Sequence, residues 1–252
     1  MIERTVLPYM LKQYNRHVVK SPLLNFSYNV YSQDGEDGIL KRIFDVLSDR
    51  HRYFVEFGAW DGKYLSNCCN LIHESGWSGC FIEGDGRKFQ ILLNNHGLNP
   101  RISCLNKFVE PDGVNSLDNI LSSLNDFRPR IVVIEFNPTV PNDVVFVQAR
   151  NITINQGCSL LALIELGGVK GYELICCTGW NAFFVLKDFF PLFGILDNSI
   201  HAMYQPKLDG RIFHGYDSFV YTIGMPNFFW ADIPITSYDF QLLPESLRRF
   251  KG

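Results

Sequence analysis

Two short segments of the sequence combine glycines with carboxylates in a pattern that suits ligand binding. The first, FVEFGAWDG over residues 54–62, is an apolar stretch followed by Gly58 and Gly62. Glycines at such a turn let a ligand approach the backbone, and a helix that begins beyond it offers free N–H groups. The second, FIEGD over residues 81–85, carries two acids about 20 residues beyond the turn. We expect both segments to line one site, although the first would also serve as an ordinary strand–helix turn.

The charges of these segments discriminate between nucleotide-like ligands. Glu56 and Asp61 bracket the turn, Glu83 and Asp85 end the second segment, and Lys63 is the only base close in sequence. A pyrophosphate there would meet like charge, which is unfavourable in a low effective dielectric. The dinucleotide pattern Gly-x-Gly-x-x-Gly is also absent. S-adenosylmethionine suits these residues better, because it carries a sulfonium, an ammonium and ribose hydroxyls that an acid of the second segment can accept.

A third polar segment, EFNPTVPND over residues 135–143, follows another apolar stretch. Polar groups directly after a buried strand lie where open α/β sheets bind ligands. Two prolines stiffen this loop, so that Asn137 and Asp143 are held with little entropy left to lose. The alternative is a proline-rich turn capped by its Asn and Asp side chains.

Further polar residues give weaker signals. Asn155 and Gln156 either contact a substrate or introduce the helix that follows them. His214 lies in an aromatic C-terminal stretch and is a candidate general base facing an acceptor hydroxyl. The six histidines show no His-x-x-x-His spacing and the seven cysteines no Cys-x-x-Cys spacing, so we expect no metal site. The nucleophile pattern Gly-x-Ser-x-Gly does not occur.

The elements that must position these residues follow from hydrophobic periodicity. Apolar residues at helical spacing predict an amphipathic helix over 34–47. Four apolar stretches rich in β-forming residues predict strands over 52–58, 78–85, 102–109 and 130–136. The segments between them are long enough for crossover helices, which we predict at 64–75, 86–95 and 116–124. This alternation predicts a doubly wound, mostly parallel α/β sheet. A helix beginning near Leu160 and an antiparallel hairpin over 172–187, turning at Thr178–Trp180, complete the pattern.

Composition bounds the class of protein. The chain has 252 residues, a net charge of −3 and 46% apolar residues, which indicates a globular protein and excludes disorder. No basic stripe favours nucleic acid, and no apolar run approaches the length of a membrane span. Cysteines within apolar stretches and a poor secretory signal favour the reducing cytoplasm. We divide the chain into a lead-in (1–30), a main domain (31–187) and an aromatic cap that would contact substrate (188–252).

EFGAWDG followed by FIEGD resembles the class I S-adenosylmethionine-dependent methyltransferases. The longer pattern is similar to their FkbM-like branch, whose members often modify sugars and surface polysaccharides. Supporting stretches span about 220 residues and include YSQDGED, LSNCCNLI, GWSGCFIEGD, SLDNIL, VVIEFNPTVPNDVVFVQ, NQGCSLLALIELGGVKGYEL, GWNAFFVLKD and LLPESLRRF. The resemblance implies a seven-stranded Rossmann-like sheet that ends in an antiparallel hairpin. It also implies cofactor contacts at Glu56, Gly58, Asp61 and Gly62, a ribose contact at Glu83 and a neighbouring role for Gln33.

The implied reaction is methyl transfer to an oxygen of a sugar or sugar-linked small molecule, in capsule or lipopolysaccharide decoration. Asn137 would orient the acceptor, and Glu135 or His214 would act as the base, with no metal required. In one respect the chain departs from the family: no Asp-x-Asp-Gly segment lies between SLDNIL and VVIEFN. Either residues 130–136 take the place of that strand, or part of the site is lost.

Two alternatives remain open at this stage. One is a catalytically inactive protein that keeps S-adenosylmethionine as a ligand and serves as a binding partner. The other is a nicotinamide-dependent oxidoreductase, which the glycine spacing and the acidic turn disfavour. The sequence leaves open the acceptor, the atom methylated and the oligomeric state, a homo-oligomer included.

Overall fold

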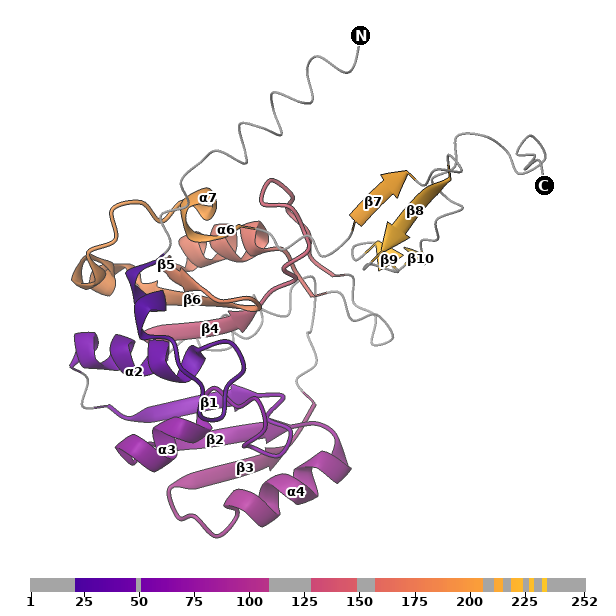
Figure 1. Ribbon diagram of the computed structural model, residues 1–252. Coiled ribbons are helices and arrows are strands. Elements are labelled where there is room, and N and C mark those ends of the chain that lie inside the picture. Colours follow the sequence, from indigo (N-terminus) through magenta and orange to yellow (C-terminus); the bar gives the residue numbers. More distant parts are fainter. Residues whose placement is uncertain are drawn as a thin grey trace, which may run out of the picture.

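The computed structural model describes residues 21–48, 51–108, 128–148, 157–205 and four short segments, 211–214, 219–223, 227–228 and 233–234. The helix predicted over 116–124 and the candidate residues Asn155 and Gln156 lie outside these ranges. Within them the fold is α/β, with one parallel and one antiparallel three-stranded sheet (Figure 1).

The first three predicted strands form the parallel sheet. β1 (Tyr53–Phe57) pairs with β2 (Ser78–Glu83), which pairs in turn with β3 (Ile102–Asn106), all in parallel. The connections are helices α3 (Cys69–Ser75) and α4 (Gly86–His96). The apolar side chains of both helices pack with Phe54, Phe81 and Trp77 in one core cluster. The crossover units predicted from these stretches are therefore confirmed for three strands.

Helix α3 begins at Cys69, five residues later than the helix predicted over 64–75. The preceding residues are held as a loop by side chains that accept backbone N–H groups. Asp61 Oδ1 accepts from the amides of Lys63 and Tyr64, at 2.8 and 2.7 Å. Leu65 has a positive φ of 58°, which a right-handed helix does not accommodate. Local hydrogen bonds to an acid have overridden the helical apolar pattern here.

The predicted hairpin is also confirmed. β5 (Tyr172–Cys177) and β6 (Asn181–Leu186) pair in antiparallel fashion, and β6 pairs on its other edge with β4 (Ile131–Glu135). Helix α6 (Leu160–Lys170) packs against this sheet and begins at Ser159, whose hydroxyl accepts from the amide of Ala162. In the order β4–β6–β5, the central strand β6 runs antiparallel to both of its neighbours.

The two sheets do not join through hydrogen bonds in the part of the chain that is described. β1 pairs with β2 alone and β4 with β6 alone, so the expected seven-stranded sheet is not seen. The arrows of β1, β2, β3 and β4 nevertheless point toward the same side of the molecule (Figure 1). The carboxyl ends that were expected to carry the site thus face one way, but β4 is not hydrogen-bonded to β1.

Helix α2 (Glu36–Leu47) links the two sheets. Its apolar residues pack with Ile175, Phe183 and Val185 of the β5–β6 hairpin. Phe44 contacts this cluster and also the core of the first sheet, where its ring lies 4.3 Å from that of Trp77. The short 3₁₀ helix η1 (Pro22–Phe26) precedes α2 and contributes Leu23 to the same core. Burial of one helical stripe therefore fixes both sheets around α2.

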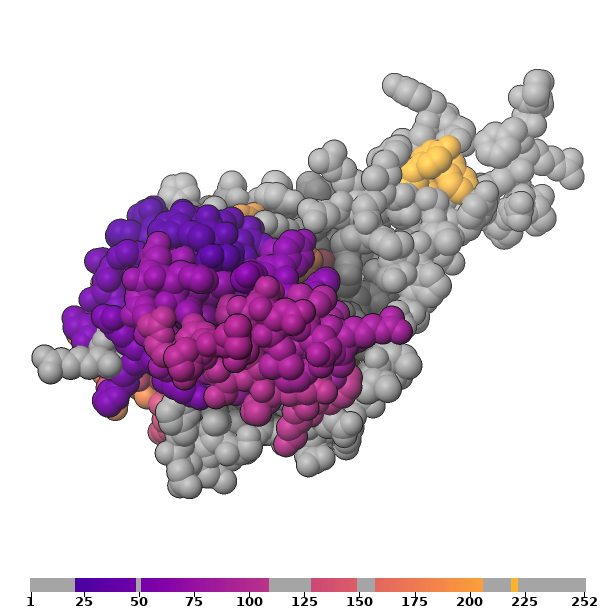
Figure 2. Space-filling view, turned by 90° about the horizontal axis from the view of Figure 1, so that it is seen from below, coloured from indigo at the N-terminus to yellow at the C-terminus, as the bar shows by residue number. Residues whose placement is uncertain are grey.

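The C-terminal region begins with η2 (Lys187–Phe193) and α7 (Ile200–Met203), which contribute Phe193 and Met203 to the cores around the second sheet. Two small antiparallel pairs follow: β7 (Arg211–His214) with β8 (Val220–Ile223), and β9 (Asn227–Phe228) with β10 (Ile233–Pro234). Figure 2 shows the yellow residues of this region apart from the indigo-to-magenta body of the first sheet. The aromatic cap stays a prediction. Across the described ranges, no helix has the length and apolar character needed to cross a bilayer.

Glu36 is a fully buried carboxylate at the start of α2. Its Oε2 accepts from the amide of Asp34 at 2.7 Å. Its Oε1 accepts from Thr178 Oγ1 at 2.7 Å and from Asn181 Nδ2 at 3.0 Å, both in the β5–β6 turn. Three donors thus compensate the desolvation of one charge, and the contact fixes the N-terminus of α2 on the hairpin.

We expect Glu36→Ala to lower the free energy of unfolding by roughly 3 kcal/mol or more, because two buried donors and one part-buried donor lose their acceptor. For a chain of this size that corresponds to a fall in Tm of about 6–12 °C. Calorimetry or circular dichroism measures it.

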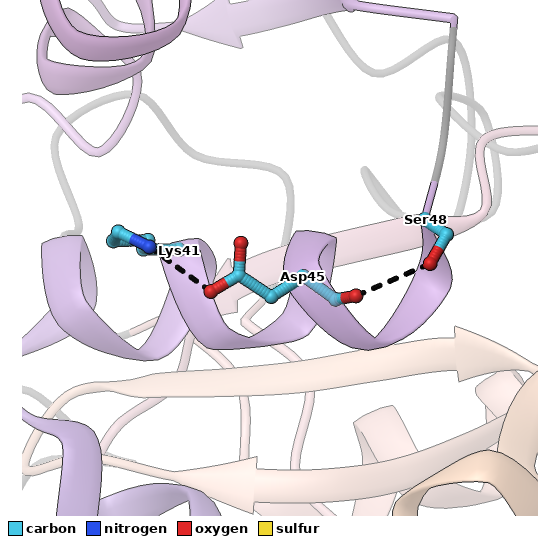
Figure 3. Close-up of polar contacts among 3 residues, drawn as sticks. All are labelled: Lys41, Asp45 and Ser48. Atoms are coloured by element: carbon cyan, nitrogen blue, oxygen red, sulfur yellow. Dashed lines mark hydrogen bonds and ion pairs between the residues drawn. The ribbon is translucent and has the colours of Figure 1, made fainter.

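Asp45→Ala in the same helix is the matched control. Asp45 Oδ2 pairs with Lys41 Nζ at 3.0 Å and the Asp45 carbonyl accepts from Ser48 Oγ, all at the surface (Figure 3). An exposed pair of this kind adds little to stability, so Tm should hardly change. An equal loss in both variants would contradict a special role for the buried carboxylate.

Candidate functional site

Glu83 joins the carboxyl ends of β1 and β2. The residue is 7% exposed, and its Oε2 accepts from the amide of Trp60 at 2.8 Å. Oε1 accepts from the amide of Asp85, also at 2.8 Å. Each oxygen has one protein donor and can still accept a second hydrogen bond from a ligand. The acid predicted to contact ribose therefore also shapes the turn after β1.

The two glycines of that turn have different surroundings. Gly58 has a φ of +63°, and a Cβ added to it would meet no atom within 4 Å. Gly62 has a φ of +70°, but a Cβ there would lie 2.7 Å from both the His96 ring and Leu92. Gly58 thus faces open space in which a ligand can reach the backbone, whereas Gly62 is needed for close packing against α4.

The other three predicted cofactor acids are engaged in the local structure. Glu56 accepts from Ser66 Oγ at 2.8 Å and the amide of Asn67 at 3.2 Å, while burial raises its pKa. Asp61 caps the loop described above. Asp85 caps α4 by accepting from the amides of residues 87 and 88, and these hydrogen bonds lower its pKa. Their contacts with a cofactor stay predictions, but each now has a structural role.

Gln33 lies in the loop that leads into α2, and its side chain is exposed. The loop is organised by Asp37, whose Oδ2 accepts from three successive amides of residues 30–32 and from Ser32 Oγ. The Gln33 carbonyl accepts from Asn29 Nδ2 at 2.9 Å. Because α2 runs on into β1, this loop lies toward the carboxyl end of β1, where a neighbouring role for Gln33 remains a prediction.

The loop after β4 supports the capped-turn interpretation of its Asn. Asn137 is buried, and its Oδ1 accepts from the amide and the hydroxyl of Thr139. The loop is braced from α7, since Asn142 Nδ2 donates to the Tyr204 carbonyl at 3.0 Å and Tyr204 Oη donates to the Pro138 carbonyl at 3.2 Å. Asp143 beyond it is exposed.

Glu135 ends β4 opposite Asn181 of β6. The residue is exposed, yet its carboxyl is sufficiently desolvated to raise the pKa above the ordinary value. Its charge also acts on Cys158, whose pKa burial and this carboxylate raise to about 11. A carboxylate of raised basicity at a strand end is suited to accept a proton. His214, the other candidate base, ends β7, which lies apart from the ends of β1 and β4 in Figure 1.

Three residues of α4 contact the turn and were not identified from the sequence. Asn95 Nδ2 donates to the Asp61 carbonyl at 2.8 Å, and His96 Nε2 lies 2.9 Å from the Gly62 carbonyl. Lys88 Nζ lies 4.2 Å from the centre of the Trp60 ring, so Lys63 is not the only base near the turn. No short-range pattern links these residues to the turn; the only signal was a polar Asn–His pair ending a predicted helix.

No group of three or more His, Cys, Asp or Glu side chains suited to a metal ion occurs among the residues whose placement is described. The expectation of a metal-free site stays a prediction.

Comparison with known proteins gives limited information. No family model matches the sequence, and no curated protein matches it. Among solved structures, the chain is similar to the crystal structure of a "putative RNA methyltransferase" from Pyrococcus horikoshii. The identity is 10%, the match covers 70% of this chain and 95% of that chain, and the TM-score is 0.38. A TM-score this low establishes no shared function.

We expect the protein to lose stability in part through His96 as the pH falls below about 6.5. Burial lowers the pKa of this imidazole below its ordinary 6.5. The unfolded chain therefore binds the proton first as the pH falls, and the stability present above pH 6.5 is progressively lost. Tm measured from pH 8 to pH 5 should fall less steeply in His96→Gln than in the unchanged protein. Parallel curves for the two proteins would contradict this role.

Proposed function

We propose that the turn after β1 and the Glu83 carboxylate bind S-adenosylmethionine, and that the protein transfers its methyl group to an oxygen of a sugar or sugar-linked small molecule. The observation that carries this proposal is the junction at Glu83. A buried acid at the end of β2 holds the Trp60 amide of the turn, next to the open space at Gly58.

The residues present fit the nucleoside half of this cofactor. Ribose hydroxyls are donors, and both Glu83 oxygens keep acceptor capacity beyond the amides of Trp60 and Asp85. Gly58 leaves its backbone open to a ligand at the same strand ends. Two bases near the turn contact neutral groups, Lys88 over the Trp60 ring and Lys63 Nζ with Asn95 Oδ1 at 3.2 Å. The acids of the two segments, Glu56, Asp61, Glu83 and Asp85, favour a cationic methyl donor over a pyrophosphate.

S-adenosylmethionine supplies an electrophilic methyl group when bound, so the main task of the protein is positioning. The acceptor oxygen gains the methyl group and loses its proton. Glu135 is the better placed of the two candidate bases, because its raised pKa increases its affinity for that proton. Asn137 stiffens the loop beside it through Thr139, and an acceptor would be oriented by this loop.

The inactive binding partner is the second candidate function. It is favoured by the pairing of β4 with β6 alone, because no described strand is then hydrogen-bonded to the edge of β1 opposite β2 to carry further acids toward the site. The nicotinamide alternative is weaker, because the acids described above surround the turn. Binding without turnover separates the second candidate from the first, and NADH binding would support the third.

We expect S-adenosylhomocysteine to bind, and Glu83→Gln to weaken binding about 10- to 100-fold. The replacement keeps the shape but sets an amide N–H against a backbone N–H and removes an acceptor for ribose, a loss of about 1–3 kcal/mol. Isothermal titration calorimetry with S-adenosylhomocysteine, and with NADH for comparison, measures the affinities.

Asp85→Asn tests the other predicted cofactor acid of this segment, since Asn can still cap α4 and the same charge is removed two residues away. Its affinity should fall less than that of Glu83→Gln, because the Glu83 carboxylate is the one that holds the Trp60 amide of the turn. If Asp85→Asn weakens binding and Glu83→Gln does not, the ribose acid is Asp85; no binding at millimolar ligand contradicts the proposed function.

We expect Glu135→Gln to lower kcat by about 100-fold or more while leaving S-adenosylhomocysteine affinity intact, because general-base help is worth about 10²–10⁴ in rate. In the unchanged protein the rate should fall as the pH drops through the raised pKa of Glu135, and the variant should lack this limb. The assay is methyl transfer to a panel of nucleotide sugars and glycan fragments. If His214→Ala removes the rate instead, His214 is the base.

A further inference from the structure

The turn after β1 is held in an unfavourable backbone conformation. Trp60 has a φ of +51° and Gly62 a φ of +70°, and a left-handed conformation at a bulky residue persists only where surrounding contacts fix it. The backbone amides of the turn donate hydrogen bonds to β2 and within the turn. The Ala59 amide donates to the Ile82 carbonyl at 3.1 Å, and the Trp60 amide donates to Glu83.

The carbonyl side of the turn is bound by α4. Asn95 Nδ2 reaches the Asp61 carbonyl and His96 Nε2 the Gly62 carbonyl. Since a carbonyl can only accept, Nε2 of His96 carries the proton. The Asn95 amide is itself oriented, because its Oδ1 accepts from Lys63 Nζ at 3.2 Å. Two consecutive carbonyls therefore meet two consecutive side chains of one helix.

His96 is buried between the turn and β2. It is 4% exposed, and its ring centre lies 4.9 Å from that of Phe81 in β2. The missing Cβ of Gly62 leaves the room for the ring, which approaches that position to 2.7 Å. The same helix also begins beside the ribose acid, because the Asp85 amide at its N-cap donates to Glu83 Oε1. Helix α4 thus contacts both the turn after β1 and Glu83 at the end of β2.

We infer that Asn95 and His96 are positioning residues for the ligand-binding turn: without touching the ligand, they hold the carbonyls of Asp61 and Gly62 so that Gly58 and the Trp60 amide keep the geometry that binds the nucleoside. The inference rests on the proposed function for its ligand, but not for the contacts. The two residues set affinity through the shape of the turn.

The test compares Asn95→Asp with Asn94→Asp. Asn95 is partly buried on the turn, whereas its neighbour Asn94 is exposed, so the same chemical change is made with and without the contact. Asn95→Asp replaces the donor by a carboxylate facing the Asp61 carbonyl. Hydrogen exchange of the Trp60 and Gly62 amides in the ligand-free protein should become about 10-fold faster or more, and S-adenosylhomocysteine should bind about 10-fold more weakly. Asn94→Asp should change neither.

A second pair separates positioning from packing at His96. Gln carries an N–H donor at similar reach, so His96→Gln should keep most of the exchange protection and affinity. His96→Leu fills the space with an apolar side chain that has no donor, and it should lose both. Unchanged amide exchange in Asn95→Asp and His96→Leu overturns the inference, whatever binding does. Faster exchange in those variants, together with no ligand binding by the unchanged protein, supports the positioning role and contradicts the proposed function.

Discussion

The hydrogen bond between the Glu83 carboxylate and the Trp60 amide is the contact on which the geometry of the candidate site depends. It ties the turn after β1 to the end of β2, across two strands that pair in parallel along their whole length. A buried carboxylate is costly unless donors surround it, and here backbone amides of two segments provide them. The acid is consequently fixed in place before any ligand arrives, which is the preorganisation that binding requires.

Carboxylates that accept backbone N–H groups recur throughout the structure. Asp37 organises the loop before α2, Asp61 the loop before α3, and Asp85 the start of α4. Glu36 extends the same device to tertiary structure, since its donors belong to the hairpin of the second sheet. Several acids that a sequence pattern assigns to a ligand thereby have a first role in shaping the loops at the strand ends.

Helix α2 has a comparable role for the sheets. With β1 and β4 not hydrogen-bonded to each other in the described ranges, the packing of α2 on both cores is what relates the two sheets. Phe44 and Trp77 form the contact common to both sides. The relative positions of the turn after β1 and the loop after β4 therefore depend largely on α2. A substitution that shifts α2 should alter both.

The sequence by itself determined the elements whose signals are local. The three parallel strands, helices α3 and α4 between them and the hairpin turning at Thr178–Trp180 all follow from apolar period and glycine placement, because those patterns depend on residues near in the chain. The candidate site residues were predicted to follow apolar strands, and in the structure they lie at or directly after the ends of β1, β2 and β4; that they bind a ligand stays a prediction.

Only the tertiary structure decided which groups those polar residues contact. Glu56 accepts from Ser66 Oγ in the loop before α3, whereas Glu83 accepts from the Trp60 amide in the turn after β1. Asn95 and His96 act on carbonyls 34 residues earlier in the chain. A sequence pattern reveals the hydrophobic period of one helix or strand. These contacts depend on how two elements pack against each other, and a hydrogen bond between them does not alter the hydrophobic period of either element.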